Sequence, residues 1–461
     1  MGVGISNWRL ARAVAQCGQL GVVSGTGLDN LLIRRLEDGD PGGHMREAMA
    51  AFPIQSAVDS LQRRLASRPH RPGGPYSVLP LYKLGSGASR QQASMLAAFV
   101  EVWLAKQGHG GQVGINLLTK IQPPTLPTLY GAMLAGVDYV LMGAGIPREI
   151  PAALERLALH EPAEVRLDVA GASSDKAYRV SFDPHEHWEH PSAPLRCPRF
   201  VPIVASTLLA SVLVRKTTGR IDGLVIESPS AGGHSAAPRG ELRLDANGEP
   251  IYGERDVVDL NKIRELGVPF WLAGGTGNPR ALQAARASGA AGVQVGTLFA
   301  YCEESGMDDE LKHSVLSYAA RGEVRVRTDV RASPTGYPFK LVEWPDDPSA
   351  GKDRRRVCDI GYLREAYVTP AGTVGFRCAA EPVDVYVKKG GAREDTVGRR
   401  CLCNGLMATA GHPQRRRNEI EPPLLTSGDD LVRIGEFLAG RDRYRAADVV
   451  DYLLGTSAPA A

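Results

Sequence analysis

The stretch ESPSAGGHSAAPRG, residues 227–240, places chemically useful residue types directly after an apolar run. Glu227 ends that run, and Gly232, Gly233 and His234 follow it. A neutral imidazole can take a proton from a substrate because its unperturbed pKa lies near neutral pH. Two glycines also leave room for a ligand against the backbone. Two interpretations stay open at this point: a ligand lies against the glycines and His234 faces it, or the turn needs glycine beside an incidental histidine.

A second motif, FWLAGGTGNPRALQAARASGAAGVQVGT at residues 270–297, is typical of a phosphate site. One predicted strand ends in Gly274 and Gly275, and the next ends in Gly296 and Thr297. Backbone N–H groups at neighbouring strand ends can converge on an anion, and Thr297 can add a hydroxyl donor. The alternative is that these glycines only make tight turns.

Short apolar runs separated by helical patterns predict the elements that position both motifs. Continuous apolar runs are typical of parallel strands that are covered on both faces, and strand–helix alternation indicates a parallel α/β fold. The predicted strands are residues 20–24, 112–117, 137–142, 201–205, 223–227, 268–273 and 292–296. The predicted helices are residues 8–17, 89–107, 125–135, 150–157, 208–217 and 279–288.

The predicted strands are one short of a (β/α)₈ barrel. The deficit falls at the amino terminus, where MGVGIS leads directly into a helix. We predict a TIM-type barrel whose first strand was lost to a late start site; the alternative is an open sheet. Residues 1–330 would form the barrel domain, with excursions at 38–88 and 144–200. Residues 331–461 would form an irregular C-terminal elaboration that closes on a helix-like tail, GDDLVRIGEFLAG.

Composition narrows the class of partner. A formal net charge of +3 over 461 residues is too small to indicate a nucleic-acid or membrane surface. The most apolar run, residues 201–214, is shorter than a membrane span, and the amino terminus does not resemble a secretory signal. Seven cysteines form an odd, sparse set that is typical of reduced thiols. We expect a cytoplasmic protein that acts on a small molecule, with the choice between monomer and homo-oligomer left open.

Four of the cysteines fall in the C-terminal elaboration: Cys358, Cys378, Cys401 and Cys403. Four thiols are enough for a structural zinc ion or a metal cluster. Their spacing matches no zinc ribbon or finger, and the CLC pair is tighter than the usual C-x₂-C. We therefore expect buried thiols and assign no metal site from the sequence.

Five motifs, taken in order, resemble those of the nitronate monooxygenase family, formerly called 2-nitropropane dioxygenases. They are VGISNWRLARAVAQCGQLGVVS, VGINLL, AGGH, LAGGTGNPRALQAARASGAAGVQVGT and TGYPFK, and the resemblance covers roughly residues 1–340. It implies a TIM-barrel core and an FMN cofactor. The family also includes FMN-dependent enoyl-ACP reductases.

The resemblance also implies which residues meet the cofactor. His234 matches the catalytic histidine of the family, and Met1 matches a methionine-bearing loop under the flavin. Glu227 departs from the family, which commonly has glutamine there; an ionised carboxylate cannot donate a hydrogen bond, so it suits a ribityl hydroxyl better than a flavin carbonyl. The implied FMN contacts are Met1, Asn116, Glu227, Gly232, Gly233, Gly274, Gly275, Gln294, Val295, Gly296 and Thr297.

The activity implied by the resemblance is the oxidation of alkyl nitronates or nitroalkanes with O₂ to carbonyl compounds and nitrite. His234 would remove the α-proton of a neutral nitroalkane. The first alternative is an enoyl-thioester (enoyl-ACP) reductase of fatty acid or polyketide synthesis, in which hydride passes from NAD(P)H through FMN to the substrate. The second alternative is a barrel that binds flavin or another phosphorylated ligand without turnover.

Overall fold

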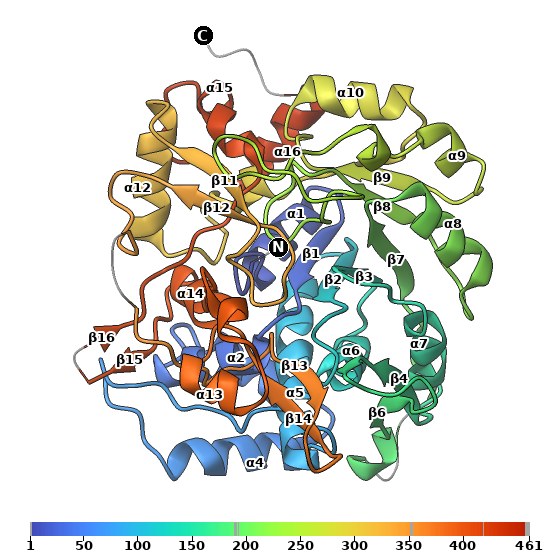
Figure 1. Cartoon of the computed structure of the whole chain (residues 1–461), viewed down its shortest axis with the longest axis vertical. Coiled ribbons are helices and arrows are strands. Elements are labelled where there is room, and N and C mark those ends of the chain that lie inside the picture. The colour runs from blue at the N-terminus through green and yellow to red at the C-terminus, as the bar shows by residue number, and fades with distance from the viewer. Residues whose placement is uncertain (1, 189–190, 192, 351–353, 418, 457–461) are drawn as a thin grey trace.

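The computed structural model describes residues 2–188, 191, 193–350, 354–417 and 419–456 (Figure 1). Its centre is a seven-stranded sheet in the order β1-β2-β3-β7-β8-β9-β10, and every neighbouring pair is parallel. The strands are β1 (Gly21–Ser24), β2 (Val113–Leu118), β3 (Tyr139–Gly143), β7 (Arg199–Val204), β8 (Leu224–Glu227), β9 (Phe270–Ala273) and β10 (Gly292–Gln294). All seven predicted strands are therefore confirmed.

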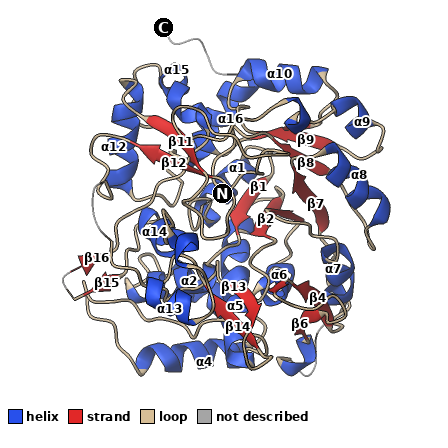
Figure 2. Ribbon diagram, viewed as in Figure 1, coloured by secondary structure: helices blue, strands red, loops and turns tan. Residues whose placement is uncertain are grey.

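Helices between the strands cover the outside of this curled sheet (Figure 2). All six predicted helices are present, with small differences at their ends. They are α1 (Trp8–Gln16), α5 (Ala88–Lys106), α6 (Thr125–Leu134), α7 (Ile150–Ala158), α8 (Thr207–Lys216) and α10 (Pro279–Ala287). A short α9 (Leu260–Arg264) lies between β8 and β9. The sequential strand order with interleaved helices confirms a TIM-type α/β fold, in which the described residues supply seven parallel strands of an incomplete barrel.

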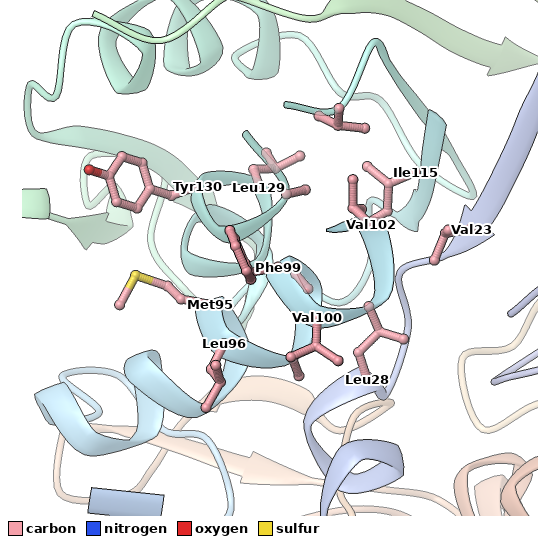
Figure 3. Close-up of a cluster of buried hydrophobic side chains, with 14 of the residues drawn as sticks. Val23, Leu28, Met95, Leu96, Phe99, Val100, Val102, Ile115, Leu129 and Tyr130 are labelled. Carbon is pink, nitrogen blue, oxygen red and sulfur yellow. The ribbon is translucent and has the colours of Figure 1, made fainter. Parts of the chain in front are cut away.

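The main core lies where α5 and α6 pack against β1 and β2 (Figure 3). Helix α5 is buried on nearly all sides, and Phe99, Val100 and Val102 from it are no more than 3% exposed. Ile115 of β2 and Val23 of β1 are fully buried against this layer. Apolar residues on both faces of the strands explain why their sequence reads as continuous runs.

In the described residues the sheet is open between β10 and β1, its two edge strands. The loop before α1 covers part of the β1 edge: the Ser24 N–H donates to the Ser6 carbonyl at 2.8 Å. The Ser6 hydroxyl donates to the Val22 carbonyl at 2.5 Å. Helix α16 (Ala446–Leu454) packs against both α1 and α10, so it bridges this gap from outside. This place is the position that an eighth strand would occupy.

The two excursions are more regular than the sequence indicates. The first excursion, residues 38–88, contains α3 (His44–Ala50) and α4 (Gln55–Ala66), and α2 (Leu28–Glu37) precedes it. Helix α4 buries only Ala57, Val58 and Leu61 in an otherwise polar sequence, so its apolar stripe is narrow. Between α7 and β7 lie β4 (Ala163–Leu167), β5 (Val169–Ala170) and β6 (Tyr178–Phe182).

The C-terminal part packs against the barrel by short elements. Strand β11 (Arg325–Asp329) pairs with β12 (Phe339–Glu343), and this pairing spans residue 330, where we placed a domain boundary. That boundary stays a prediction. Strand β13 (Glu365–Val368) pairs with β14 (Val374–Arg377) and also with β5. After these come α13 (Val383–Lys388) and α14 (Leu402–Thr409).

The predicted helical tail is broken in two. Residues Asp429–Arg433 form a 3₁₀ turn, and α15 (Ile434–Leu438) follows it. Leu431, Ile434 and Leu438 are buried as the apolar spacing predicts, although the backbone is not one helix. Nowhere in the described residues is a helix both long and apolar enough to span a membrane.

Candidate active site

A cavity of about 380 Å³ lies at the carboxyl ends of β8, β9 and β10. Its floor is the apolar inside of the barrel, where Leu141, Val201 and Val225 pack together. It extends sideways to the gap between β10 and β1, where Leu10, Val450 and other apolar residues of α1 and α16 line it. Nine of the eleven predicted FMN residues line this one cavity: Glu227, Gly232, Gly233, Gly274, Gly275, Gln294, Val295, Gly296 and Thr297.

The glycines after β9 are required by the backbone and by close neighbours. Gly274 has φ +89°, and a Cβ atom there would lie 2.7 Å from the Ala231 nitrogen and 2.6 Å from the Ser228 hydroxyl. Gly275 also has positive φ, +68°. Within the described part of the chain, the backbone N–H groups of Gly275, Gly296 and Thr297 have no hydrogen-bond acceptor. Unpaired amide donors beside an open cavity fit an anionic ligand.

Helix α10 starts beside these glycines. The Asn278 side chain caps it by accepting from the Ala281 N–H at 2.9 Å, and Pro279 occupies its first position. The positive end of the helix dipole therefore points toward the glycine-lined end of the cavity. This geometry is the one that the sequence motif predicts.

A loop from the C-terminal part, Thr426–Asp430, forms the opposite wall and was not predicted. The Gly428 N–H donates to the Thr297 hydroxyl at 3.0 Å, and the Asp429 N–H donates to the Ser230 carbonyl at 3.0 Å. The Gly277 N–H donates to the Asp430 carboxylate at 3.2 Å. Since the Thr297 oxygen accepts from Gly428, its own O–H is still available to donate to a ligand.

Asp430 brings an acidic group to the same end of α10 that the phosphate motif occupies. Burial raises the pKa of its carboxyl group above the usual range. A nearby phosphate would raise that pKa further, because two negative charges repel each other. The C-terminal wall therefore opposes an anion that the barrel wall attracts.

Glu227 lies at the end of β8, where its side chain faces the cavity. Burial raises the pKa of this carboxyl group to about 7. Near neutral pH a substantial fraction of Glu227 is therefore protonated and can donate a hydrogen bond. The sequence predicts an ionised carboxylate at this position, which could only accept hydrogen bonds. A protonated Glu227 can instead donate a hydrogen bond, as the amide of a glutamine would.

His234 directly follows Gly233 of the cavity wall, but it is not among the described residues that line the cavity. Its Nε2 atom is 2.6 Å from the Ser333 hydroxyl, and its ring contacts Phe339 edge-on at 4.9 Å between centroids. Burial, together with the charge of Lys120, lowers the pKa of His234 to about 3. The imidazole is therefore neutral at physiological pH, and Ser333 fixes its orientation.

Lys120 is a candidate site residue that the sequence did not indicate. It follows β2, and its Nζ atom lies over the ring of Tyr337. In the described residues this buried Nζ atom has no hydrogen-bond partner. Burial lowers the pKa of Lys120 to about 7. Its sequence context, LLTK, carries no motif, so only the fold brings this amine near His234.

Two predicted cofactor residues are not among the described residues that line the cavity. Asn116 is buried in β2 and pairs in register with Leu141, whose side chain faces the barrel interior. Neighbours in a parallel ladder face the same side, so Asn116 also points inward, although it is not among the described residues that line the cavity. Met1 lies outside the described residues.

The fold and this cavity define a class: an α/β barrel protein with a ligand site at the carboxyl ends of its strands. Residues 172–334 match the model of the nitronate monooxygenase family, an oxidoreductase family. This segment contains Glu227, His234 and both glycine groups, so the resemblance inferred from the motifs is confirmed there.

Two curated relatives share this similarity, and both are named probable nitronate monooxygenase. One, from Staphylococcus haemolyticus (strain JCSC1435), is 34% identical over 97 residues, which are 21% of this chain and 26% of the relative. The other, from Staphylococcus saprophyticus subsp. saprophyticus, is 27% identical over 118 residues, which are 25% of this chain and 32% of the relative. The chain thus matches about a third or less of the length of these relatives.

Among solved structures, FabK from Thermotoga maritima aligns with a TM-score of 0.48 and 15% identity, over 98% of this chain and 88% of its own. A nitroalkane oxidase from Streptomyces ansochromogenes aligns with a TM-score of 0.44 and 15% identity, over 99% of this chain and 94% of its own. These scores describe a distant likeness.

Proposed function

We propose that this protein is an FMN-dependent oxidoreductase that uses O₂ to oxidise alkyl nitronates or nitroalkanes to carbonyl compounds and nitrite. The observation that carries the proposal is the convergence of nine expected FMN residues on one cavity, within a segment that matches nitronate monooxygenases. The volume of that cavity lies in the range typical of small-ligand sites.

The residues present fit FMN. The phosphate group would be held by the N–H groups of Gly275, Gly296 and Thr297 at the start of α10. The apolar barrel interior would hold the flavin ring, with Glu227 and the inward-facing Asn116 as its polar partners. When bound, FMN supplies the electron transfer between substrate and acceptor, which no side chain here can provide.

The protein would supply the proton transfer. Neutral His234 can accept the α-proton of a nitroalkane, but burial and Lys120 both oppose the imidazolium that results. An anion formed beside Lys120 offsets that cost, because the ammonium then gains a counter-charge. The two residues would therefore work together: His234 takes the proton and Lys120 stabilises the negative charge left on the substrate.

Anaerobic reduction tests this proposal directly. The purified protein should be yellow, and propyl-2-nitronate should bleach the flavin band near ~450 nm, with nitrite released when O₂ is admitted. Prompt bleaching by NADPH without bleaching by the nitronate would reject the monooxygenase activity. A colourless protein that gains no flavin on incubation with FMN would leave only a barrel for another phosphorylated ligand.

One observation favours the enoyl-thioester reductase as the second candidate. The cavity does not end at the strand termini but continues between α1, α10 and α16, where Leu10, Leu282 and Leu453 line it. An apolar extension of this kind suits an acyl chain better than a small nitroalkane. The same anaerobic experiment separates the two candidates, since only the reductase requires a nicotinamide donor.

A further inference from the structure

Four cysteines from distant parts of the C-terminal sequence surround one small enclosed cavity. Cys358 precedes β13, Cys378 follows β14, and Cys401 and Cys403 lie at the start of α14. The cavity is lined by Pro334, Cys358, Gly361, Leu363, Cys378, Ala380, Cys401, Leu402 and Cys403. Every cysteine of this C-terminal region therefore faces the same space.

The other three cysteines provide a comparison within the same chain. Cys17 follows α1, Cys197 is exposed before β7, and Cys302 is buried beyond α11 (Thr297–Ala300). None of them lies at the four-cysteine cavity. Apolar packing explains a single buried thiol such as Cys302, but it gives no reason for four thiols to meet.

Polar backbone groups face the sulfur atoms of this cavity. The backbone of Leu363 faces Cys403 and that of Ala380 faces Cys378, and each favours the thiolate, although burial and the neighbouring thiols leave the pKa of both cysteines raised. The Asn404 side chain also donates to the Cys401 sulfur at 3.5 Å. Amide donors of this kind stabilise thiolate sulfur, and they surround the sulfur ligands of protein metal centres.

Charged groups near the cavity also suit thiolates. Arg364 lies close enough to Cys358, Cys378 and Cys403 to act on their charge, and Arg354 acts on Cys401 in the same way. The nearby carboxylate of Glu381 is paired with Lys389 at 2.7 Å. Four thiolates around a divalent metal carry a net negative charge, which Arg364 would partly compensate; Arg354 is already paired with the carboxylate of Glu421.

In the described residues no three His, Cys, Asp or Glu side chains are placed to hold a metal ion, so the four sulfur atoms do not converge on one point. Cys358 and Cys378 lie close to each other, and this contact lowers the pKa of Cys358. A change of χ1 rotamer re-aims a cysteine sulfur without moving its backbone. Binding would therefore require rotation of side chains into the cavity, and no rearrangement of the fold.

We propose that these four cysteines form a thiolate-ligated metal centre, occupied by Zn²⁺ or by an iron–sulfur cluster. Four sulfur ligands in tetrahedral arrangement are typical of both. The centre would cross-link the β13–β14 hairpin to α14. Both segments consist of short elements. Because Leu406 and Thr409 of α14 line the large cavity, the same centre would stabilise the C-terminal wall of the active site.

Metal analysis of the full-length protein tests the proposal. The protein is produced with zinc and iron in the medium, purified without chelators and without oxygen, and assayed for both metals and acid-labile sulfide. We expect about one Zn per chain without sulfide, or about four Fe with about four sulfides. Chemical assay is needed because flavin absorbance would overlap that of a cluster. Less than about 0.1 metal ion per chain would overturn the proposal.

A variant pair assigns the ligands. Cys403→Ser should lose the metal, whereas Cys197→Ser, which changes an exposed cysteine outside the cavity, should retain it. If Cys403→Ser fails to fold, thiol titration of the unaltered protein in denaturant replaces it. About four additional reactive thiols should appear when chelator is added. About two that appear only with a reductant would show a Cys358–Cys378 disulfide in place of a metal centre, and would reject the proposal. None of these readouts depends on flavin turnover.

Discussion

The barrel wall of the large cavity and its C-terminal wall face the same ligand space with different chemistry. The barrel wall consists of strand ends and the start of α10, and it presents backbone N–H groups from Gly275, Gly296 and Thr297. The C-terminal wall is the loop Thr426–Asp430, which brings an acidic side chain to the same place. The barrel wall attracts an anion, and the acidic side chain of the C-terminal wall repels it.

The difference shows where affinity and selectivity arise. Gly275 follows β9, which has a neighbour on both sides, so its amide donor is fixed before a ligand arrives, whereas Gly296 and Thr297 follow the edge strand β10. The C-terminal loop is held by a few hydrogen bonds, such as that from the Gly233 N–H to the Thr426 hydroxyl at 2.9 Å. We therefore expect changes in the barrel wall to remove cofactor or turnover, and changes in the C-terminal wall to adjust binding.

The largest effect should come from His234 on the barrel side. His234→Ala should keep FMN but lose turnover of neutral nitroalkanes by roughly 10²-fold or more, the usual scale for a general base. Preformed nitronates need no proton removal, so their oxidation should fall much less. Steady-state nitrite release with both substrates measures this split, and equal losses for both would contradict the assignment.

Gly274→Ala tests the barrel wall itself. The added Cβ atom meets the Ala231 nitrogen at 2.7 Å, and φ +89° is strained for alanine, so we expect FMN affinity to fall about tenfold or more. Gly248→Ala is the matched control, since it also has positive φ but no atom within 4 Å of its added Cβ. FMN affinity is measured by flavin fluorescence. Similar losses in both variants would indicate that backbone strain, and not the close contact of the added Cβ atom, lowers the affinity.

Lys120→Met should separate charge from packing beside His234. Without the ammonium, KM for an anionic nitronate should rise about tenfold, the loss of one charge contact worth about 1.4 kcal/mol. Lys176→Met is the control, because Lys176 also lies over a tyrosine ring, that of Tyr178. An unchanged KM in Lys120→Met would remove Lys120 from the site.

Asp430→Asn tests the C-terminal wall in the opposite direction. Removing a negative charge near the phosphate should strengthen FMN binding about three- to fivefold at a pH where wild-type Asp430 is ionised. The gain should shrink as the pH falls toward the raised pKa of Asp430, because the wild-type group then becomes neutral. FMN titrations at pH 6 and pH 8 measure the trend, and weaker binding at both would show that the two walls do not oppose each other.

Glu227→Gln tests the barrel interior through the pH dependence of stability. Burial raises the pKa of Glu227 in the folded protein from 4.5 to about 7, so the unfolded chain releases this proton first as the pH rises. The wild type therefore loses stability between about pH 4.5 and 7, by at most about 3 kcal/mol. Glutamine does not titrate, so thermal unfolding should favour the variant at pH 8 relative to pH 5. A constant difference in Tm would mean that Glu227 is not buried as described.

The sequence predicted the parts of the site whose signal is local. Val113–Leu118 and Phe270–Ala273 are recognisable because both faces of a barrel strand are apolar, and Gly274 is recognisable because its backbone allows little else. The loop Thr426–Asp430 gave no signal, since its role depends on contacts with strand ends far away in the sequence. Lys120 was missed for the same reason.

Two other misses have different physical causes. The tail at residues 428–440 has helical apolar spacing, but the hydrogen bonds of Asp429 and Asp430 to the barrel hold its first turn as a 3₁₀ segment. The ionisation of Glu227 could not be read from its residue type, because burial sets its pKa. The spacing of the cysteines matched no known motif, although the fold brings all four together.

The opening between β10 and β1 gives the barrel a seam. Strands β3 and β7 have a neighbour on both sides, whereas β1 and β10 each pair with one strand in the described residues. Ser6 adds hydrogen bonds to β1 alone, and α16 packs against α1 and α10 outside the gap. Amide hydrogens along the seam should exchange with deuterium earlier than those of β3 and β7. Partial opening would therefore begin there, next to the apolar extension of the cavity, and would give a long substrate a side entrance.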